Sequence, residues 1–239
     1  MRIFQPWSKL MIDLGENVGV LEFRGPDAVR FLNGQVTQDV RKVLQSEEVI
    51  TSCVTDAKGK LQFRIGLAKG ESEEVVLIFC RGQMLDGLEA RLTRYLIADD
   101  VEVRDVSEEI DLSNFKFPDQ GIGERERIER GLPKWGVELV EGMLPPEAGL
   151  DVTDISYNKG CYIGQEVISR IKSAGKVNRR LVKFCFDEVG EIGEFVNADG
   201  KVCGEVTSVD GEIGLGYLKR SAEGGTEFFL NNRNVKIVG

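Results

Sequence analysis

The octapeptide Lys159–Glu166 (KGCYIGQE) is the most informative stretch of the chain, because it sets one cysteine between two glycines, next to a tyrosine and near a lysine. The run that follows, Glu166 to Ile171, has apolar residues that share one helical face, so we predict a helix that begins near Ile163. Amides at a helix N-terminus and a nearby lysine both favour a thiolate. A free cysteine can equally be a small buried hydrophobe, so both interpretations of Cys161 stay open.

The composition is that of an ordinary globular protein. The chain has 239 residues, of which 41% are hydrophobic and 30% are charged. No apolar run approaches the length of a membrane span, and residues 1–7 (MRIFQPW) lack the core of a signal peptide. We therefore expect a cytoplasmic protein that has no membrane contact.

Cysteine and histidine usage excludes several kinds of chemistry. The five cysteines are widely spaced with no Cys-x-x-Cys pair, which argues against a disulfide framework and a zinc site and fits a reducing compartment. The chain has no histidine, so catalytic triads, Cys-His dyads and histidine-ligated metals are excluded. Proton transfer would have to use carboxylates, Lys, Tyr, Cys or water. We predict no resident metal site.

The charge is unevenly distributed. The net charge is −9, which disfavours direct binding of nucleic acid. Residues 167–183 nevertheless contain six basic residues and no acidic one. This basic island is typical of a site for a small polyanion or an acidic partner, although a solvated lysine-rich surface would give the same pattern.

Hydrophobic periodicity predicts an α+β protein with two regions. Strands expected at 18–23, 49–55, 60–68, 74–80 and 101–106 alternate with helical patterns, which indicates a largely antiparallel sheet. Beyond residue 176, short strands separated by Asn/Asp/Gly turns predict a small β-barrel or sandwich. We place the division after residue 175, with an α+β region at 1–175, whose subdomains are separate or interleaved, and a β-barrel at 176–239.

Several segments together resemble the YgfZ family of folate-binding proteins, relatives of the aminomethyltransferase (T-protein) of the glycine cleavage system. The resemblance covers nearly the whole chain, and the octapeptide is its most specific part. The matching segments are 31–39 (FLNGQVTQD), 56–60 (DAKGK), 127–133 (RIERGLP), 144–150 (LPPEAGL), 159–166 followed by Arg170, and the barrel segments 204–208 and 214–218.

This resemblance implies a fold and a ligand. The implied fold is a ring-like arrangement of two α+β subdomains and a small C-terminal antiparallel β-barrel, with a tetrahydrofolate site in the central channel. Glu129 occupies the position of the pterin-binding glutamate, and a carboxylate can accept both neighbouring pterin N–H bonds. Taken alone, Glu129 lies in an alternating charged run that is typical of surface salt bridges. Cations between Arg170 and Arg180 could hold the glutamyl tail of folate.

The resemblance also implies a function. The expected role is that of a folate-binding accessory protein for iron–sulfur cluster assembly or repair in client enzymes, such as those that thiolate tRNA. Cys161 would be the working thiol and a transient ligand of iron or a cluster, and a cluster would need further ligands from a second copy, glutathione or a partner. Lys159 would keep the thiol ionised, Tyr162 and Gln165 would shape the folate pocket, and Arg170 would pair with folate or Glu166. The implied motif residues are Lys159, Gly160, Cys161, Tyr162, Gly164, Gln165 and Glu166.

One departure from the T-protein bears on catalysis. The acidic positions that follow its hairpin turn fall here on Gln62 and Phe63, and neither can take a proton. We therefore expect that aminomethyl transfer has been lost while the folate site has been kept. Two alternatives stay open: a tetrahydrofolate-dependent one-carbon transferase that uses another carboxylate, and a folate-binding structural module in which Cys161 is simply packed.

Overall fold

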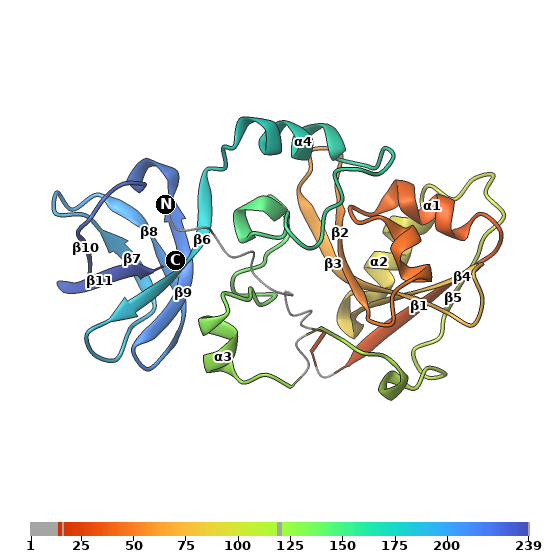
Figure 1. Ribbon diagram of the computed structural model, residues 1–239, viewed down its shortest axis with the longest axis horizontal. Coiled ribbons are helices and arrows are strands. Elements are labelled where there is room, and N and C mark those ends of the chain that lie inside the picture. The colour runs from red at the N-terminus through yellow and green to blue at the C-terminus, as the bar shows by residue number, and fades with distance from the viewer. Residues whose placement is uncertain (1–13, 16, 119–120, 239) are drawn as a thin grey trace.

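The computed structural model describes residues 14–15, 17–118 and 121–238. The segment 1–7, on which the targeting prediction depends, lies outside the described residues. The chain forms a sheet lobe and a barrel lobe, which are connected by a long segment of short helices and loops (Figure 1). Among the residues described, no helix is both long and apolar enough to cross a bilayer.

The sheet lobe is built on an antiparallel sheet with strand order β2-β3-β4-β1-β5. Helices α1 (Ala28–Gln35) and α2 (Leu85–Thr93) pack on one face, where Phe31 and Leu88 join a buried apolar cluster. Phenylalanines from the segment after β5 cover the other face around Phe79. The strands are β1 Val18–Arg24, β2 Ile50–Thr55, β3 Leu61–Lys69, β4 Val75–Arg81 and β5 Glu102–Asp105.

The barrel lobe is a closed antiparallel barrel with strand order β10-β11-β6-β9-β8-β7. Its interior is filled by apolar side chains, and the rings of Phe184, Phe195 and Phe228 pack in T-shaped pairs. This burial follows from the alternating pattern of the strands, which points every second side chain inward. The strands are β6 Arg179–Phe186, β7 Gly193–Val196, β8 Val202–Asp210, β9 Ile213–Lys219, β10 Phe228–Leu230 and β11 Arg233–Val238.

The connecting segment packs against both lobes. Leu132, Leu139 and Met143 form an apolar cluster with Leu61 of the sheet lobe and Tyr217 of the barrel. The segment carries α3 (Glu124–Glu129), beside the barrel, and α4 (Gln165–Ala174), which leads from the sheet lobe toward β6 (Figure 1). The short 3₁₀ helices are η1 Val40–Leu44, η2 Gly82–Met84, η3 Leu112–Asn114, η4 Pro145–Ala148 and η5 Arg220–Ala222.

The predicted α+β class and C-terminal antiparallel barrel are confirmed. The second α+β subdomain is less regular than the resemblance implied, because the described residues outside the barrel form one sheet and the connecting segment contributes mainly short helices. The helix that we expected near Ile163 begins at Gln165. Helix α4 ends at Ala174 and the first barrel strand starts at Arg179, and the division of the chain after residue 175 stays a proposal.

Candidate functional site

The signature octapeptide is held against the sheet lobe by hydrogen bonds to segment 31–39 and to Thr55 at the end of β2. The Ile163 amide donates to the carbonyl oxygen of Gly34 at 3.3 Å. The Thr55 hydroxyl donates to the carbonyl oxygen of Ile163 at 2.7 Å. Segments 31–39, 56–60 and 159–166, which are far apart in the sequence, therefore converge on one loop.

Close contact between two glycines fixes the hairpin turn to the start of α4. Gly164 has φ +88°, and a Cβ atom at this position would lie 2.5 Å from the Asp56 carbonyl oxygen and 2.9 Å from the Gly59 Cα. Both the left-handed backbone and the lack of space require glycine. A Cβ on Gly59 would in turn lie 3.3 Å from the Gly164 carbonyl oxygen. The positions of the turn and of the signature loop are therefore linked.

The Lys159 side chain is buried, with 8% of its surface exposed. Its ammonium donates to the carbonyl oxygens of Val36 and Gln38, both at 2.8 Å, and lies 5.2 Å from the centre of the Tyr162 ring. Burial is the main cause that lowers the pKa of Lys159 to about 7. The negative charge of Asp39 partly raises this pKa again, whereas the positive charge of Arg41 lowers it further. Lys159 thus clamps the signature loop to segment 36–38, and its predicted effect on the Cys161 thiol stays a prediction.

Cys161 is exposed, whereas Cys53, Cys80 and Cys203 are buried and Cys185 is half-buried. Burial raises the pKa of Cys80 to about 12 and raises that of Cys53 strongly. The alternative that Cys161 is a packed core residue therefore disagrees with the structure. The helix starts at Gln165, so Cys161 lies outside its first turn, and the helix dipole acts on this sulfur less than the sequence suggested.

The other predicted residues of the octapeptide have different environments. Tyr162 is buried with Ile155 and Ile168, its hydroxyl makes no hydrogen bond, and burial raises its pKa. The Gln165 amide donates to the Tyr162 carbonyl oxygen at 3.2 Å. Arg170 and Glu166 are both exposed, and their charged groups lie 3.9 Å apart, which is one of the two pairings expected for Arg170.

A buried ion pair beneath the signature loop was not anticipated from the sequence. Arg64 Nε donates to Asp154 Oδ2 at 2.7 Å, and the two side chains are 3% and 0% exposed. The hydroxyls of Thr51 and Thr153 each donate to Asp154 Oδ1 at 2.7 Å. The run 150–155 (LDVTDI) contains two aspartates, and no local pattern distinguished Asp154 from Asp151. This pair fixes the strand that carries Arg64 to the chain that leads into the octapeptide.

Gln62 lies where the resemblance implies an acidic residue of the T-protein. Its Oε1 accepts from Arg91 Nε at 2.8 Å, and Arg91 also donates to Gln35 Oε1 and to the Thr55 carbonyl oxygen. Burial lowers the pKa of Arg91. Gln62 therefore acts here as a neutral acceptor for a guanidinium, which fits the expected loss of a proton-accepting group.

Glu129 lies on α3, well away from α4 in Figure 1, so the structure does not bring it to Cys161. Its side chain is 51% exposed and pairs with Arg125 Nε at 3.1 Å. The buried charges nearby are instead Arg127 and Glu138, which lie 3.0 Å apart. Glu138 also accepts from the Ser208 hydroxyl at 2.6 Å, so this pair connects the α3 region to the barrel.

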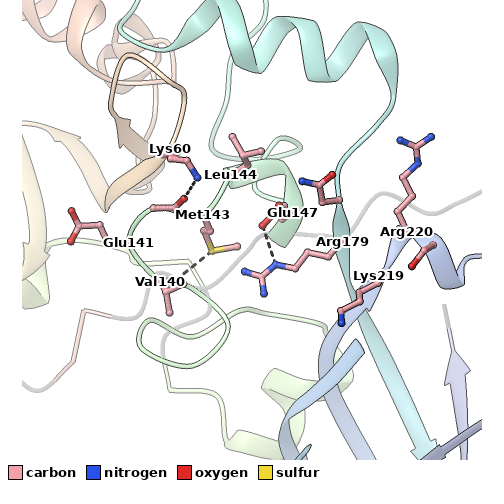
Figure 2. Close-up of a pocket in the computed structure, with 12 residues that line it drawn as sticks. Lys60, Val140, Glu141, Met143, Leu144, Glu147, Arg179, Lys219 and Arg220 are labelled. Atoms are coloured by element: carbon pink, nitrogen blue, oxygen red, sulfur yellow. Dashed lines mark hydrogen bonds and ion pairs between the residues drawn. The ribbon is translucent and has the colours of Figure 1, made fainter. Parts of the chain in front are cut away.

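A pocket of about 910 Å³ opens between the hairpin turn, the connecting segment and the barrel (Figure 2). Val140, Met143 and Leu144 supply apolar surface, and its cations come from both lobes. Its charged lining residues are Lys60, Glu141, Glu147, Arg179, Lys219 and Arg220. Arg179, from the predicted basic island, pairs with Glu147 at 3.1 Å. The sequence did not indicate Lys219 or Arg220, and the lining does not include Glu129, Tyr162, Gln165 or Arg170, which were predicted to bind folate.

The fold defines the class of protein. The chain matches the crystal structure of the glycine cleavage system aminomethyltransferase T from Bartonella henselae with a TM-score of 0.72, covering 93% of this chain and 83% of that one at 14% identity. At this identity the match establishes the aminomethyltransferase fold alone.

Sequence comparison narrows the class. Residues 178–238 match the CAF17 C-terminal beta-barrel domain. The chain is 29% identical to an uncharacterised protein of Haemophilus influenzae over 84% of each chain. It is 32% identical to the mitochondrial iron–sulfur cluster assembly factor IBA57 of Mus musculus, over 39% of this chain but only 28% of that protein. Together these matches support a resemblance to YgfZ-like proteins and to the T-protein, which is shown for the fold over most of the chain and for the barrel at residues 178–238.

Proposed function

We propose that this protein is a folate-binding accessory factor for iron–sulfur cluster assembly or repair, and that Cys161 is its working thiol. The observation that carries the proposal is the placement of Cys161: an exposed cysteine on a loop that two other motif segments hold rigidly. The name of the mouse relative, an iron–sulfur cluster assembly factor, supports the same role. The proposed setting is the cytoplasm, with cluster enzymes such as those that thiolate tRNA as clients.

A reduced folate fits the chemistry of the central pocket. Val140, Met143 and Leu144 offer apolar contact, and Lys219 and Arg220 offer cations for the glutamyl carboxylates. The Glu129 carboxylate, which lies outside the lining of this pocket, would accept from the pterin. Lys183 lies next to Glu129, because its Nζ donates to the Glu129 carbonyl oxygen. On strand β6, Lys183 and the pocket residue Arg179 are about 13 Å apart, which gives the approximate separation of Glu129 from the pocket. An extended folate is long enough to reach from one position to the other.

The iron–sulfur cluster would be cargo and not a resident group. The residues described contain no cluster of three or more His, Cys, Asp or Glu side chains that could hold a metal ion. Cys161 can supply one thiolate ligand, and a partner protein, glutathione or a second copy would supply the others. The proposed contribution of this chain is therefore an accessible thiol at a fixed position.

Complementation tests the role of Cys161. In a strain that lacks the gene, a Cys161→Ser variant should fail to restore the activity of a cluster enzyme, while the control Cys185→Ser should restore it. Equal rescue by the two variants would refute the assignment of the working thiol.

Calorimetric titration with tetrahydrofolate tests the ligand. Glu129→Ala and the double variant Lys219→Ala/Arg220→Ala should each weaken binding at least tenfold, which corresponds to about 1.4 kcal/mol or more. Lys201→Ala, an exposed barrel residue outside the pocket, is the control. Unchanged affinity in all the variants would remove folate from this pocket.

A one-carbon transferase is the second candidate, because the fold is that of an aminomethyltransferase. The neutral Gln62 and its bonds to Arg91 speak against it. Steady formation of methylene-tetrahydrofolate from an amine donor would favour this candidate, whereas tight binding without turnover would favour the accessory role.

A further inference from the structure

Helix α4 has an unusually open outer surface for an element that connects two lobes. Of its residues only Ile168 is buried. Arg170, Lys172 and the adjacent Lys176 are exposed. The hairpin turn adds the exposed Lys58, because the neighbouring Gly59 packs against Val167 and Ile168 of α4. We call Lys58, Arg170, Lys172 and Lys176 the basic face.

The carboxylates on this surface do not neutralise the basic face. Glu166 lies 3.9 Å from Arg170 and Asp151 lies 3.6 Å from Lys172, which are loose contacts for exposed groups. The Asp56 carboxylate instead accepts from backbone amides of its own turn. Within the described ranges, Lys58 and Lys176 form no ion pair. In a chain with net charge −9, such a surface attracts anionic groups.

Cys161 is exposed and precedes the first residue of α4 by four positions, and Gly59, next to Lys58, contacts Gly164 of the same loop. We propose that this face docks an acidic segment of the partner protein that Cys161 serves. This inference rests on the proposed function and specifies the chemistry of the partner. The cations would steer the partner to the thiol, because electrostatic attraction between complementary surfaces mainly raises the rate of association.

An acidic protein segment fits this face better than a nucleic acid does. Glu166 and Asp151 lie among the cations and would repel a continuous phosphate backbone, whereas side chains of a partner can be spaced to avoid them. Near α4, Tyr162 is buried and the Lys172 ammonium lies 5.0 Å from the centre of the half-buried Tyr157 ring, so neither tyrosine presents a fully open ring on which a base could stack.

Thiol–disulfide exchange with charged peptides tests the proposal. Two peptides carry one pyridyl disulfide each, one with four glutamates and one with four lysines, and both react with the full chain in the Cys185→Ser background. Each reaction forms a mixed disulfide with Cys161 and releases one pyridinethione, which is measured by absorbance. We expect the acidic peptide to react about tenfold faster at low salt, and 0.5 M salt to abolish the difference.

Matched variants identify the surface that is responsible. Lys58→Glu/Lys176→Glu should abolish the preference for the acidic peptide, while Arg94→Glu/Lys201→Glu, which changes the net charge equally at exposed positions elsewhere, should keep it. The proposal would be overturned if the two peptides reacted at equal rates with the protein that has the unchanged basic face. It would also be overturned if the two double variants changed the rate ratio of the peptides equally. Binding of an oligonucleotide to the face with no preference for the acidic peptide would also overturn it. The assay contains no folate, so a failure of the folate proposal appears separately in the calorimetry.

Discussion

Two buried ion pairs among the described residues have different structural roles. Arg64 of β3 pairs with Asp154 on the segment that leads into the octapeptide, and both carboxylate oxygens of Asp154 accept from the guanidinium or from threonine hydroxyls. Arg127 and Glu138 lie instead at the contact between the connecting segment and the barrel. The first pair fixes the entry to the signature loop, and the second fixes the relative position of two parts of the chain.

The two pairs also differ in their access to water. Arg127 shares its charge with Glu124, whose side chain is 45% exposed. Arg64 pairs with the Asp154 carboxylate, and both side chains are almost completely buried. Loss of the carboxylate should therefore be more costly for Arg64 than for Arg127, because the Arg64 site is less open to water and the desolvation of its charge is no longer offset by this ion pair.

The largest effect is expected for Asp154→Asn. The substitution leaves the buried Arg64 without its carboxylate and should lower the free energy of unfolding by about 3–5 kcal/mol. Urea denaturation at pH 7 measures the change. The control is Asp151→Asn, whose loose contact with Lys172 should contribute no more than about 1 kcal/mol. Similar losses for the two variants would contradict our view of the buried pair.

A smaller effect is expected for Glu138→Gln in the other pair. Glu124 still neutralises Arg127, so the loss should be about 2–3 kcal/mol. The same denaturation experiment checks it, with Glu129→Gln as the exposed control. If Glu138→Gln costs more than Asp154→Asn, then access to water does not distinguish the pairs.

The pH dependence of stability tests the buried position of Lys159, whose ammonium donates to the carbonyl oxygens of Val36 and Gln38. The pKa of Lys159 is lowered from 10.5 to about 7, so between these values the unfolded chain binds more protons than the folded one. Stability from this group therefore rises with pH across that window, by up to about 1.4 kcal/mol per pH unit. Denaturation of the protein and of Lys159→Met at pH 7 and 8.5 checks this. The free energy of unfolding of the variant should lack this rise between pH 7 and 8.5. The same rise in both proteins would contradict the assignment to Lys159.

The smallest effect is expected for Cys161→Ser. Because Cys161 is exposed and outside both ion pairs, its replacement should change the free energy of unfolding by less than about 0.5 kcal/mol. Mass spectrometry after brief treatment of the native protein with iodoacetamide should show modification of Cys161 and not of Cys53 or Cys80. A large loss of stability, or an unmodified Cys161, would mean that the loop buries its sulfur in solution.

Local patterns in the sequence predicted the regular parts of the fold well. Alternation and turn residues gave the strands of the sheet lobe and of the barrel, because strand periodicity and turn chemistry are local properties. The octapeptide was identified from its residues. The contacts that hold the octapeptide in place could not be identified from the sequence. Lys159, for example, donates to the carbonyl oxygens of Val36 and Gln38, which are more than 100 positions away in the sequence.

The charged run around α3 shows a second limit of sequence reasoning. Glu124, Arg127 and Glu129 belong to the same alternating pattern, yet Arg127 is buried and Glu129 is half exposed. Only the contact with the barrel distinguishes them, and no local pattern encodes that contact. The cations Lys219 and Arg220 were missed for the same reason, because the fold brings them to the pocket from the end of β9.

The outer strands of the sheet limit how other chains can attach. At one side, β5 is short and carries Glu102, Arg104 and Asp105, which discourages pairing with a foreign strand. At the other side, segment 36–38 covers β2 through the Val36–Val54 bridge and the bond from the Thr37 amide to the Cys53 carbonyl oxygen. The barrel closes on itself. A partner is thus directed to side-chain surfaces, and β-sheet aggregation between copies is suppressed by the same arrangement.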